Sequence, residues 1–103
     1  MRIVFGYIEK SGITKSGGDT LNGHFDVTHI GKGIYDIHFE PHFNSIPAII
    51  STQLWDESGL TEGGSTLDNV VMVKLENDMV RIKTGGDNGI GTDRAFTFVA
   101  IGH

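Results

Sequence analysis

The stretch NVVMVKLENDMVRIKT, residues 69–84, decides the class of the fold. Two runs rich in β-branched residues flank Asn77 and Asp78, which both tolerate the left-handed conformation that a two-residue hairpin turn requires. Such a turn fixes which residues of the two strands lie opposite one another. The predicted facing pairs are Leu75 with Val80, Val73 with Ile82, Lys74 with Arg81, and Met72 with Lys83.

The predicted pair of Lys74 and Arg81 places two positive charges opposite each other on the outer side of this hairpin. Like charges in this position are unfavourable by up to roughly 1 kcal/mol. We therefore expect a negative group beside them. It is either an acid on a neighbouring strand, such as Asp36 or Glu40, or a bound anion, or a carboxylate of a partner subunit.

The rest of the chain repeats this pattern of short apolar runs separated by Gly, Asn, Asp and Ser. A period of two dominates, and no window shows a helical stripe free of glycine. Together with the hairpin, the runs predict an all-β, antiparallel β-sandwich of six or seven strands that forms one domain over residues 1–103. The further runs lie at residues 3–8, 25–30, 34–39, 48–55 and 94–101, while residues 10–23 are predicted to form a loop.

The composition excludes several classes of protein. The 103 residues include 15 glycines, two prolines and no cysteine, so disulfide scaffolds, Cys-ligated metals and thiol catalysis are excluded. The net charge of −5 and the dispersed basic residues argue against nucleic acid and anionic membranes as partners. No apolar run approaches about 20 residues, so we expect no membrane insertion. The N-terminal residues do not resemble a signal peptide.

Two of the predicted strands are apolar on both faces. In the last strand Phe96 and Phe98 alternate with Val99 and Ile101, and residues 48–55 show the same property. A two-layer sandwich covers only one face of each sheet, and the chain offers no helix to cover the other. The pattern therefore predicts a homo-oligomer.

Signatures of catalysis are missing from the sequence, and we expect a non-enzymatic protein without catalytic residues, metal or cofactor. The chain has no nucleophile elbow, phosphate-binding loop or zinc-protease motif. Asp36, His38 and Glu40 alternate along one predicted strand and share a face, which is one way to hold zinc, nickel or iron. The alternative is an ordinary polar face, because a flat strand rarely converges enough ligands.

Two polar loops, residues 56–68 and 85–93, carry the candidate binding residues. Exposed amides and carboxylates can hydrogen-bond sugar hydroxyls, and an indole beside them can stack on a sugar ring. The alternatives are a mobile hairpin loop and a core tryptophan whose N–H is satisfied. The carbohydrate-binding candidates are Trp55, Asp56, Asp87, Asn88 and Asp93.

Most of the chain resembles the C-terminal β-sandwich modules of phage tail-fibre-like and collagen-like bacterial surface proteins. The motifs that carry the resemblance are HFDVT at 24–28, GKGIYDIHF at 31–39, FNSIPAII at 43–50 and AFTFVAIG at 95–102. The resemblance implies a surface-associated, extracellular or virion location. It also implies a trimer.

Residues 35–101 also resemble the H-type lectins, which are antiparallel sandwiches that form trimers and bind N-acetylgalactosamine-type sugars at subunit boundaries. The shared frame includes residues 37–39, Phe43, Pro47 and residues 52–54. The chain departs from these lectins in residues 85–89, GGDNG, where they carry aromatic and His residues. The resemblance implies an H-type-lectin-like trimer whose partners are glycans.

Pattern and resemblance lead to one expected function and one alternative from a different class. The expected function is a carbohydrate-binding, homo-oligomeric module, lectin-like or receptor-binding. The alternative is a structural trimerisation or cap module of a fibre or surface protein that binds no small molecule. An enzyme that uses a metal at Asp36, His38 and Glu40 is a third hypothesis.

Overall fold

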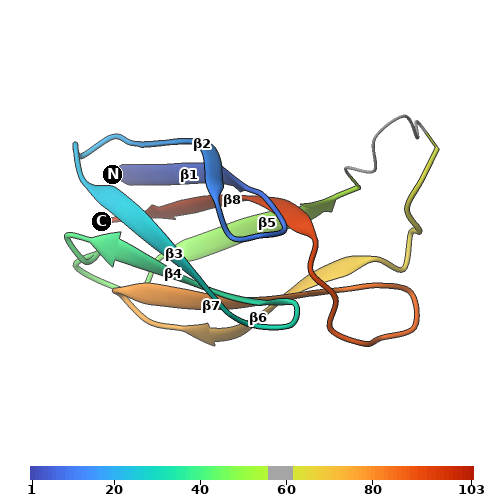
Figure 1. The fold of residues 1–103 in the computed structure, drawn as a ribbon. Helices are drawn as coiled ribbons and strands as arrows, with labels where there is room; N and C mark the ends of the chain where they lie inside the picture. Colours follow the sequence, from blue (N-terminus) through green and yellow to red (C-terminus); the bar gives the residue numbers. More distant parts are fainter. Residues whose placement is uncertain (56–61) are drawn as a thin grey trace.

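The computed structural model describes residues 1–55 and 62–103, which form an all-β, sandwich-like fold without a helix (Figure 1). The eight strands pair antiparallel throughout. Sheet A has the order β2-β1-β8-β5, and sheet B has the order β3-β4-β7-β6. The strands are β1 (Arg2–Ile8), β2 (Thr14–Asp19), β3 (His24–Gly31), β4 (Ile34–Glu40), β5 (Ala48–Leu54), β6 (Asn69–Leu75), β7 (Met79–Gly85) and β8 (Ala95–Gly102).

The strand count is eight, where the sequence predicted six or seven, because β2 lies in the segment predicted as a loop. Its residues, TKSGGD, contain no apolar side chain and so give no hydrophobic alternation. The strand forms because its backbone pairs with β1 at the edge of sheet A, with Gly18 opposite Phe5 and Ser16 opposite Tyr7.

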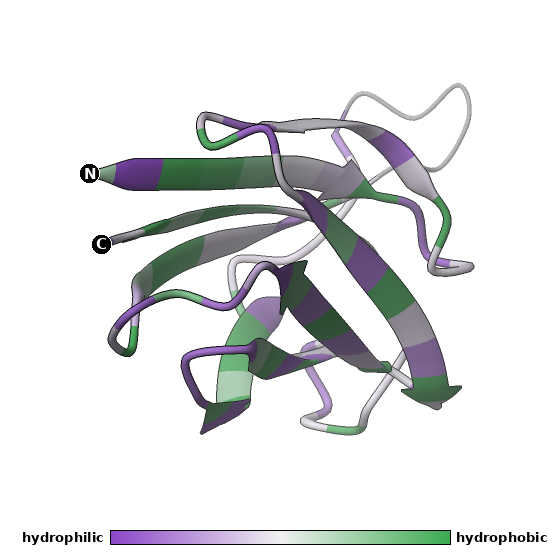
Figure 2. Cartoon of the chain, turned by 90° about the vertical axis from the view of Figure 1, so that its left-hand side faces the viewer, coloured by the Kyte–Doolittle hydropathy of each residue, from purple (hydrophilic) through white to green (hydrophobic). Residues whose placement is uncertain are grey.

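The core lies between the two sheets and is rich in aromatic rings. Figure 2 shows alternating hydrophobic and hydrophilic bands along the strands, as expected where one face of each strand is buried. Phe25 and Phe98 meet edge to face at 5.1 Å between ring centroids, as do Phe39 and Phe43 at 5.2 Å. The other core residues are Val4, Ile8, Tyr35, Ile37, Val80, Ile82, Phe96 and Ala100.

The β6–β7 hairpin confirms the predicted register next to its turn and departs from it further away. Leu75 faces Val80 and Lys74 faces Arg81, as predicted. A bulge at Val73 then shifts the pairing by one residue, so the predicted pairs Val73–Ile82 and Met72–Lys83 are wrong. The observed partners are Met72 with Ile82 and Val71 with Lys83. A bulge adds one residue to one strand, which a turn-based register does not foresee.

The predicted negative group beside Lys74 and Arg81 is Asp36 on β4. Asp36 faces Arg81 across the β4–β7 pair, and its two carboxylate oxygens accept hydrogen bonds from Nε at 2.8 Å and Nη2 at 3.1 Å. These bonds, against the opposing effect of burial, hold the pKa of Asp36 below its ordinary value.

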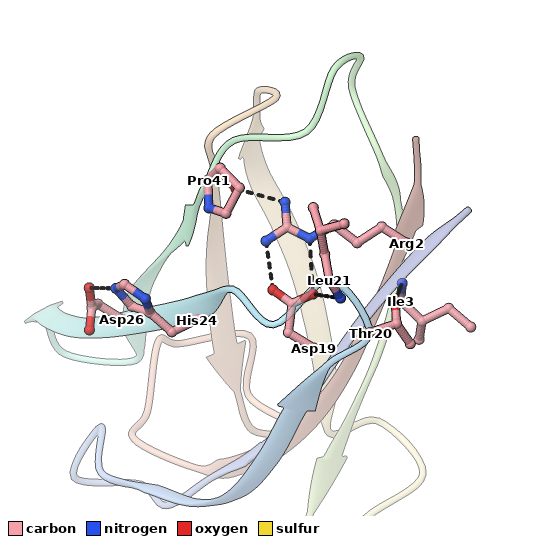
Figure 3. A network of polar contacts seen from close by, with 8 residues as sticks. All are labelled: Arg2, Ile3, Asp19, Thr20, Leu21, His24, Asp26 and Pro41. Carbon is pink, nitrogen blue, oxygen red and sulfur yellow. Dashed lines mark hydrogen bonds and ion pairs between the residues drawn. The ribbon is translucent and has the colours of Figure 1, made fainter.

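An ion pair closes the end of the sandwich near the chain termini (Figure 3). Arg2 on β1 donates from Nε and Nη2 to the carboxylate of Asp19, at 3.1 and 2.6 Å, and from Nη1 to the carbonyl of Pro41 at 2.7 Å. The side chains of Arg2 and Asp19 are only 3% and 2% exposed. The pair ties β1 and the end of β2 to the segment that follows β4.

The opposite end of the sandwich is closed by Gln53 on β5. Its amide nitrogen donates to the carbonyl of Asn69 and to that of Gly85, both at 2.8 Å. Asn69 begins β6 and Gly85 ends β7, so one side chain of sheet A holds the ends of two strands of sheet B. β5 and β7 both end on this side of the sandwich, away from the chain termini (Figure 1).

Candidate functional site

The candidate site begins with Trp55 and Arg94, which strand pairing brings together. Leu54 at the end of β5 faces Ala95 at the start of β8. Trp55 directly follows Leu54 and Arg94 directly precedes Ala95, so these two residues lie opposite each other just beyond the paired strands. The guanidinium carbon of Arg94 lies 4.9 Å from the centroid of the Trp55 indole. This distance corresponds to a cation–π contact, and the cation covers one face of the ring.

A glycine pair covers the nitrogen side of the indole. An added Cβ at Gly63 would collide with Nε1 of Trp55, so only a residue without a side chain fits there. The neighbouring Gly64 lies against Cβ and Cγ of the same tryptophan. The backbone of residues 63–64 therefore forms a wall of the site next to the ring.

Two polar nitrogens in this site are buried without a hydrogen-bond partner among the described residues. They are Nε1 of Trp55 and Nε of Arg94. Arg2 and Arg81 instead pair with carboxylates, those of Asp19 and Asp36. A buried donor that lacks a partner costs free energy, and such groups concentrate where a ligand or water completes the bonding.

Acidic residues from both polar loops stand beside the arginine. Asp68, Asp87, Trp55 and Arg94 line one cavity of about 220 Å³, together with Gly64 and Ser65. Asp68 is oriented by the backbone, because its Oδ2 accepts a hydrogen bond from the N–H of Ser65 at 2.9 Å. The cavity thus holds hydrogen-bond donors and acceptors side by side.

Gly86 lies at the meeting point of these polar groups. A Cβ on Gly86 would stand 3.2 Å from Nη2 of Arg94 and 3.7 Å from the Oδ1 atoms of both Asp68 and Asn88. The missing side chain leaves the space between them open. Asn88 uses its Oδ1 to accept from the N–H of Ile90 at 3.1 Å, which shapes the loop around this point.

A wider cleft of about 390 Å³ continues from the cavity along the gap between β5 and β6. It shares Trp55, Gly64, Ser65 and Asp68 with the cavity. Its further lining residues are Ser51, Thr52, Gln53, Gly63, Thr66, Asn69 and Val70. Cavity and cleft together offer a polar trough that is large enough for more than one small ring.

The structure brings some of the predicted site residues together and places another elsewhere. Trp55 and Asp87 line the cavity, and Asn88 stands next to it. Asp56 lies outside the described residues. Sequence reasoning missed Asp68 and Arg94. The available signal was positional, because Arg94 directly precedes the last strand and Trp55 directly follows a strand that pairs with it.

Asp93 does not line the cavity and has a structural role instead. Its Oδ1 accepts hydrogen bonds from the N–H of Gly33 at 2.6 Å and from Nε2 of His29 at 2.8 Å. Burial opposes its ionisation, but these two bonds outweigh that effect and lower the pKa of Asp93. The His29 ring stacks on Tyr35 at 4.6 Å. Asp93 therefore fastens the β7–β8 loop to the β3–β4 hairpin.

The metal hypothesis for Asp36, His38 and Glu40 finds no support in the geometry. Asp36 is engaged by Arg81 on both carboxylate oxygens, whereas His38 and Glu40 are exposed. Within residues 1–55 and 62–103, no group of three or more His, Asp or Glu side chains is arranged to hold a metal ion. The described part of the chain also contains no helix long and apolar enough to cross a membrane.

Comparison with known proteins gives no relative from which a function is transferred. No protein-family model, no curated protein and no solved structure matches the chain. The function of the chain is therefore inferred from the chemistry of the Trp55–Arg94 site.

Proposed function

We propose that this chain is a non-enzymatic, carbohydrate-binding module that acts as a homo-oligomer. The observation that carries the proposal is the cavity in which Trp55, Arg94, Asp68 and Asp87 converge, with two buried donors that lack a partner among the described residues. An indole offers an apolar ring face, and the polar groups around it fix orientation, which is the general composition of a small-molecule site.

The charges in the cavity favour a neutral sugar. Two carboxylates, Asp68 and Asp87, stand against one guanidinium, and the whole chain carries a net charge of −5. An anionic ligand would meet repulsion from both carboxylates. A hydroxyl, in contrast, both donates and accepts, so neighbouring hydroxyls can bond a carboxylate and the guanidinium at once.

Oligomerisation would multiply weak binding at each site. A single cavity of this size contacts few sugar atoms, and avidity across copies raises the overall affinity without new contacts. We propose a trimer, which is also what the resemblance to fibre modules and H-type lectins implies.

A specific observation favours a second candidate function, a structural trimerisation or cap module without a glycan ligand. The outer face of sheet A is apolar and uncovered, with Phe5 48% and Ile50 69% exposed. A protein that only caps or joins a fibre would use this face to bind other subunits, and it would have no use for the cavity.

The test is a screen of neutral and acidic glycans against the intact protein, followed by calorimetry on the best binder. We expect binding to neutral glycans, with an affinity loss of about tenfold or more in Asp87→Asn, because one acceptor is lost. The matched control is Asp78→Asn in the β6–β7 turn, an exposed acid outside the cavity, which should leave the affinity unchanged. Absence of binding across the set would refute the carbohydrate proposal and leave the structural module.

A further inference from the structure

The outer face of sheet A carries exposed apolar side chains that the proposed site leaves unexplained. Its two central rows follow from the strand register, in which Ile3 faces Ile101 and Phe5 faces Val99. On the other side of β8, Ile101 faces Ala48 and Val99 faces Ile50. Two continuous apolar rows therefore cross β1, β8 and β5.

Charged side chains are absent from this face along the three strands, all of which the structure describes. The outward positions that complete the face are Tyr7 on β1, Thr97 on β8, and Thr52 and Leu54 on β5. A positive charge stands at its border, where Nζ of Lys15 lies 5.5 Å from the centroid of the Tyr7 ring. An uncharged centre with a polar border is the usual anatomy of a protein interface.

One exposed side chain of this face is held against a neighbouring strand. The Phe5 ring lies against Gly18 of β2, whose added Cβ would stand 2.9 Å from the ring. Ile50 in the same row is 69% exposed. A side chain that is already held in place loses little conformational entropy when a partner covers it.

The size of the face suits a protein interface. Three strands about 4.8 Å apart and seven residues of about 3.3 Å each give a flat projection of roughly 330 Å². Side-chain relief raises the accessible area above this projection, toward the roughly 600 Å² per partner of the smallest stable interfaces. An exposed apolar patch of a few hundred Å² on a soluble protein is often functional.

We infer that this outer face of sheet A, formed by β1, β8 and β5, packs against the other copies of the chain in the proposed trimer. The inference rests on the homo-oligomer in the proposed function and names its surface. Charge favours a copy of the chain as the occupant, because two chains of net charge −5 repel one another least where both surfaces are uncharged. A partner recognised through charge would find nothing to bind on this face.

The experiment compares the wild type with Ile50→Glu, which places a charge in the apolar row formed by Phe5, Val99 and Ile50. The matched control is Ile13→Glu in the β1–β2 turn, where the same residue type is 63% exposed. Masses are measured by light scattering at about 50 μM, and circular dichroism reports the fold of each variant. We expect a multiple of 11.2 kDa for wild type and control, and 11.2 kDa for a folded Ile50→Glu.

Two results would overturn the inference, and they are distinguishable. A wild-type mass of 11.2 kDa would refute both the homo-oligomer and its surface. An oligomeric Ile50→Glu with the same association constant as the wild type would refute this surface alone. A second readout uses the absence of cysteine, because Ile50→Cys is then the only thiol available for a spin label. Labels on two copies should couple within a few nanometres in the oligomer, whereas Ile13→Cys labels should be farther apart.

Discussion

Trp55 and Arg94 come from the ends of two paired strands, and the guanidinium carbon lies 4.9 Å from the centroid of the indole. Each of them also has a buried nitrogen without a hydrogen-bond partner among the described residues. The contact holds both side chains in place in the lining of the cavity.

Replacement of Arg94 by Lys should weaken glycan binding by about tenfold, equivalent to about 1.4 kcal/mol. Lysine keeps the positive charge but lacks the planar fork of donors that can bond two neighbouring hydroxyls. Calorimetry with the best neutral glycan measures the effect. Arg81→Lys is the control, since Arg81 binds Asp36 away from the cavity, and an equal loss of affinity in both variants would contradict the assignment.

A side chain at Gly86 should obstruct the site without unfolding the protein. The added Cβ of Gly86→Ala would stand 3.2 Å from Nη2 of Arg94, which has to move away from its present position. We expect weaker glycan binding and a changed emission of Trp55, the single tryptophan of the chain. Gly31→Ala is the control, because its Cβ meets only Ile34 at 3.9 Å. Unchanged binding in Gly86→Ala would show that ligands do not use this space.

The buried ion pair between Arg2 and Asp19 should be important for stability. Asp19→Ala leaves the arginine buried without its carboxylate, which we expect to lower the free energy of unfolding by about 3 kcal/mol. Urea unfolding followed by circular dichroism measures this change. Glu9→Ala removes an exposed and more distant partner of Lys15, at 3.9 Å, and should cost no more than about 0.5 kcal/mol. Similar losses in both variants would contradict the role of burial.

Acid should destabilise the fold through three aspartates whose pKa is lowered. Hydrogen bonds from Arg2, Arg81 and Gly33 hold the pKa of Asp19, Asp36 and Asp93, respectively, below 3.8 in the folded protein. A lowered folded pKa means that the stabilisation is complete above the unfolded value and is lost as the pH falls from about 4 through the folded pKa.

Urea unfolding between pH 7 and pH 2 tests this acid dependence. The wild type should keep its stability down to about pH 5 and lose it below about pH 4. Asp93→Asn should lose less on acidification than the wild type does, because one of the three titrating groups is gone. Asp26→Asn, an exposed acid, is the control and should follow the wild-type curve. A wild-type stability that is constant down to pH 2 would contradict the assignment.

The sequence predicts the sandwich well where hydrophobic alternation or a short turn carries the information. The pairing of Leu75 with Val80 and the need for an acid near Arg81 both follow from two turn residues. β2 is not predictable in this way, because a glycine-containing edge strand pairs through its backbone alone. The bulge at Val73 is likewise not predictable from the turn residues, because it inserts an extra residue into β6 beyond the turn.

The candidate site is only partly predictable for the same reason. Trp55 and Asp87 are conspicuous residue types beside polar loops, and both line the cavity. Arg94 gains its role from the β5–β8 pairing, and Asp68 gains its role from the fold of the loop around Ser65. Asp93 is as polar as Asp87 in sequence, yet its contacts with His29 and Gly33 give it a structural role.

The most direct test of the central claim observes the indole N–H of Trp55 by nuclear magnetic resonance. One tryptophan gives one indole signal, and this residue lines the proposed cavity. Titration of a panel of neutral glycans into the ¹⁵N-labelled protein should shift this signal in a saturable way, and Asp87→Asn should need a concentration about tenfold higher for the same shift. An indole signal that stays in place with every glycan, at concentrations of about 10 mM, would contradict a carbohydrate site at Trp55 and Arg94.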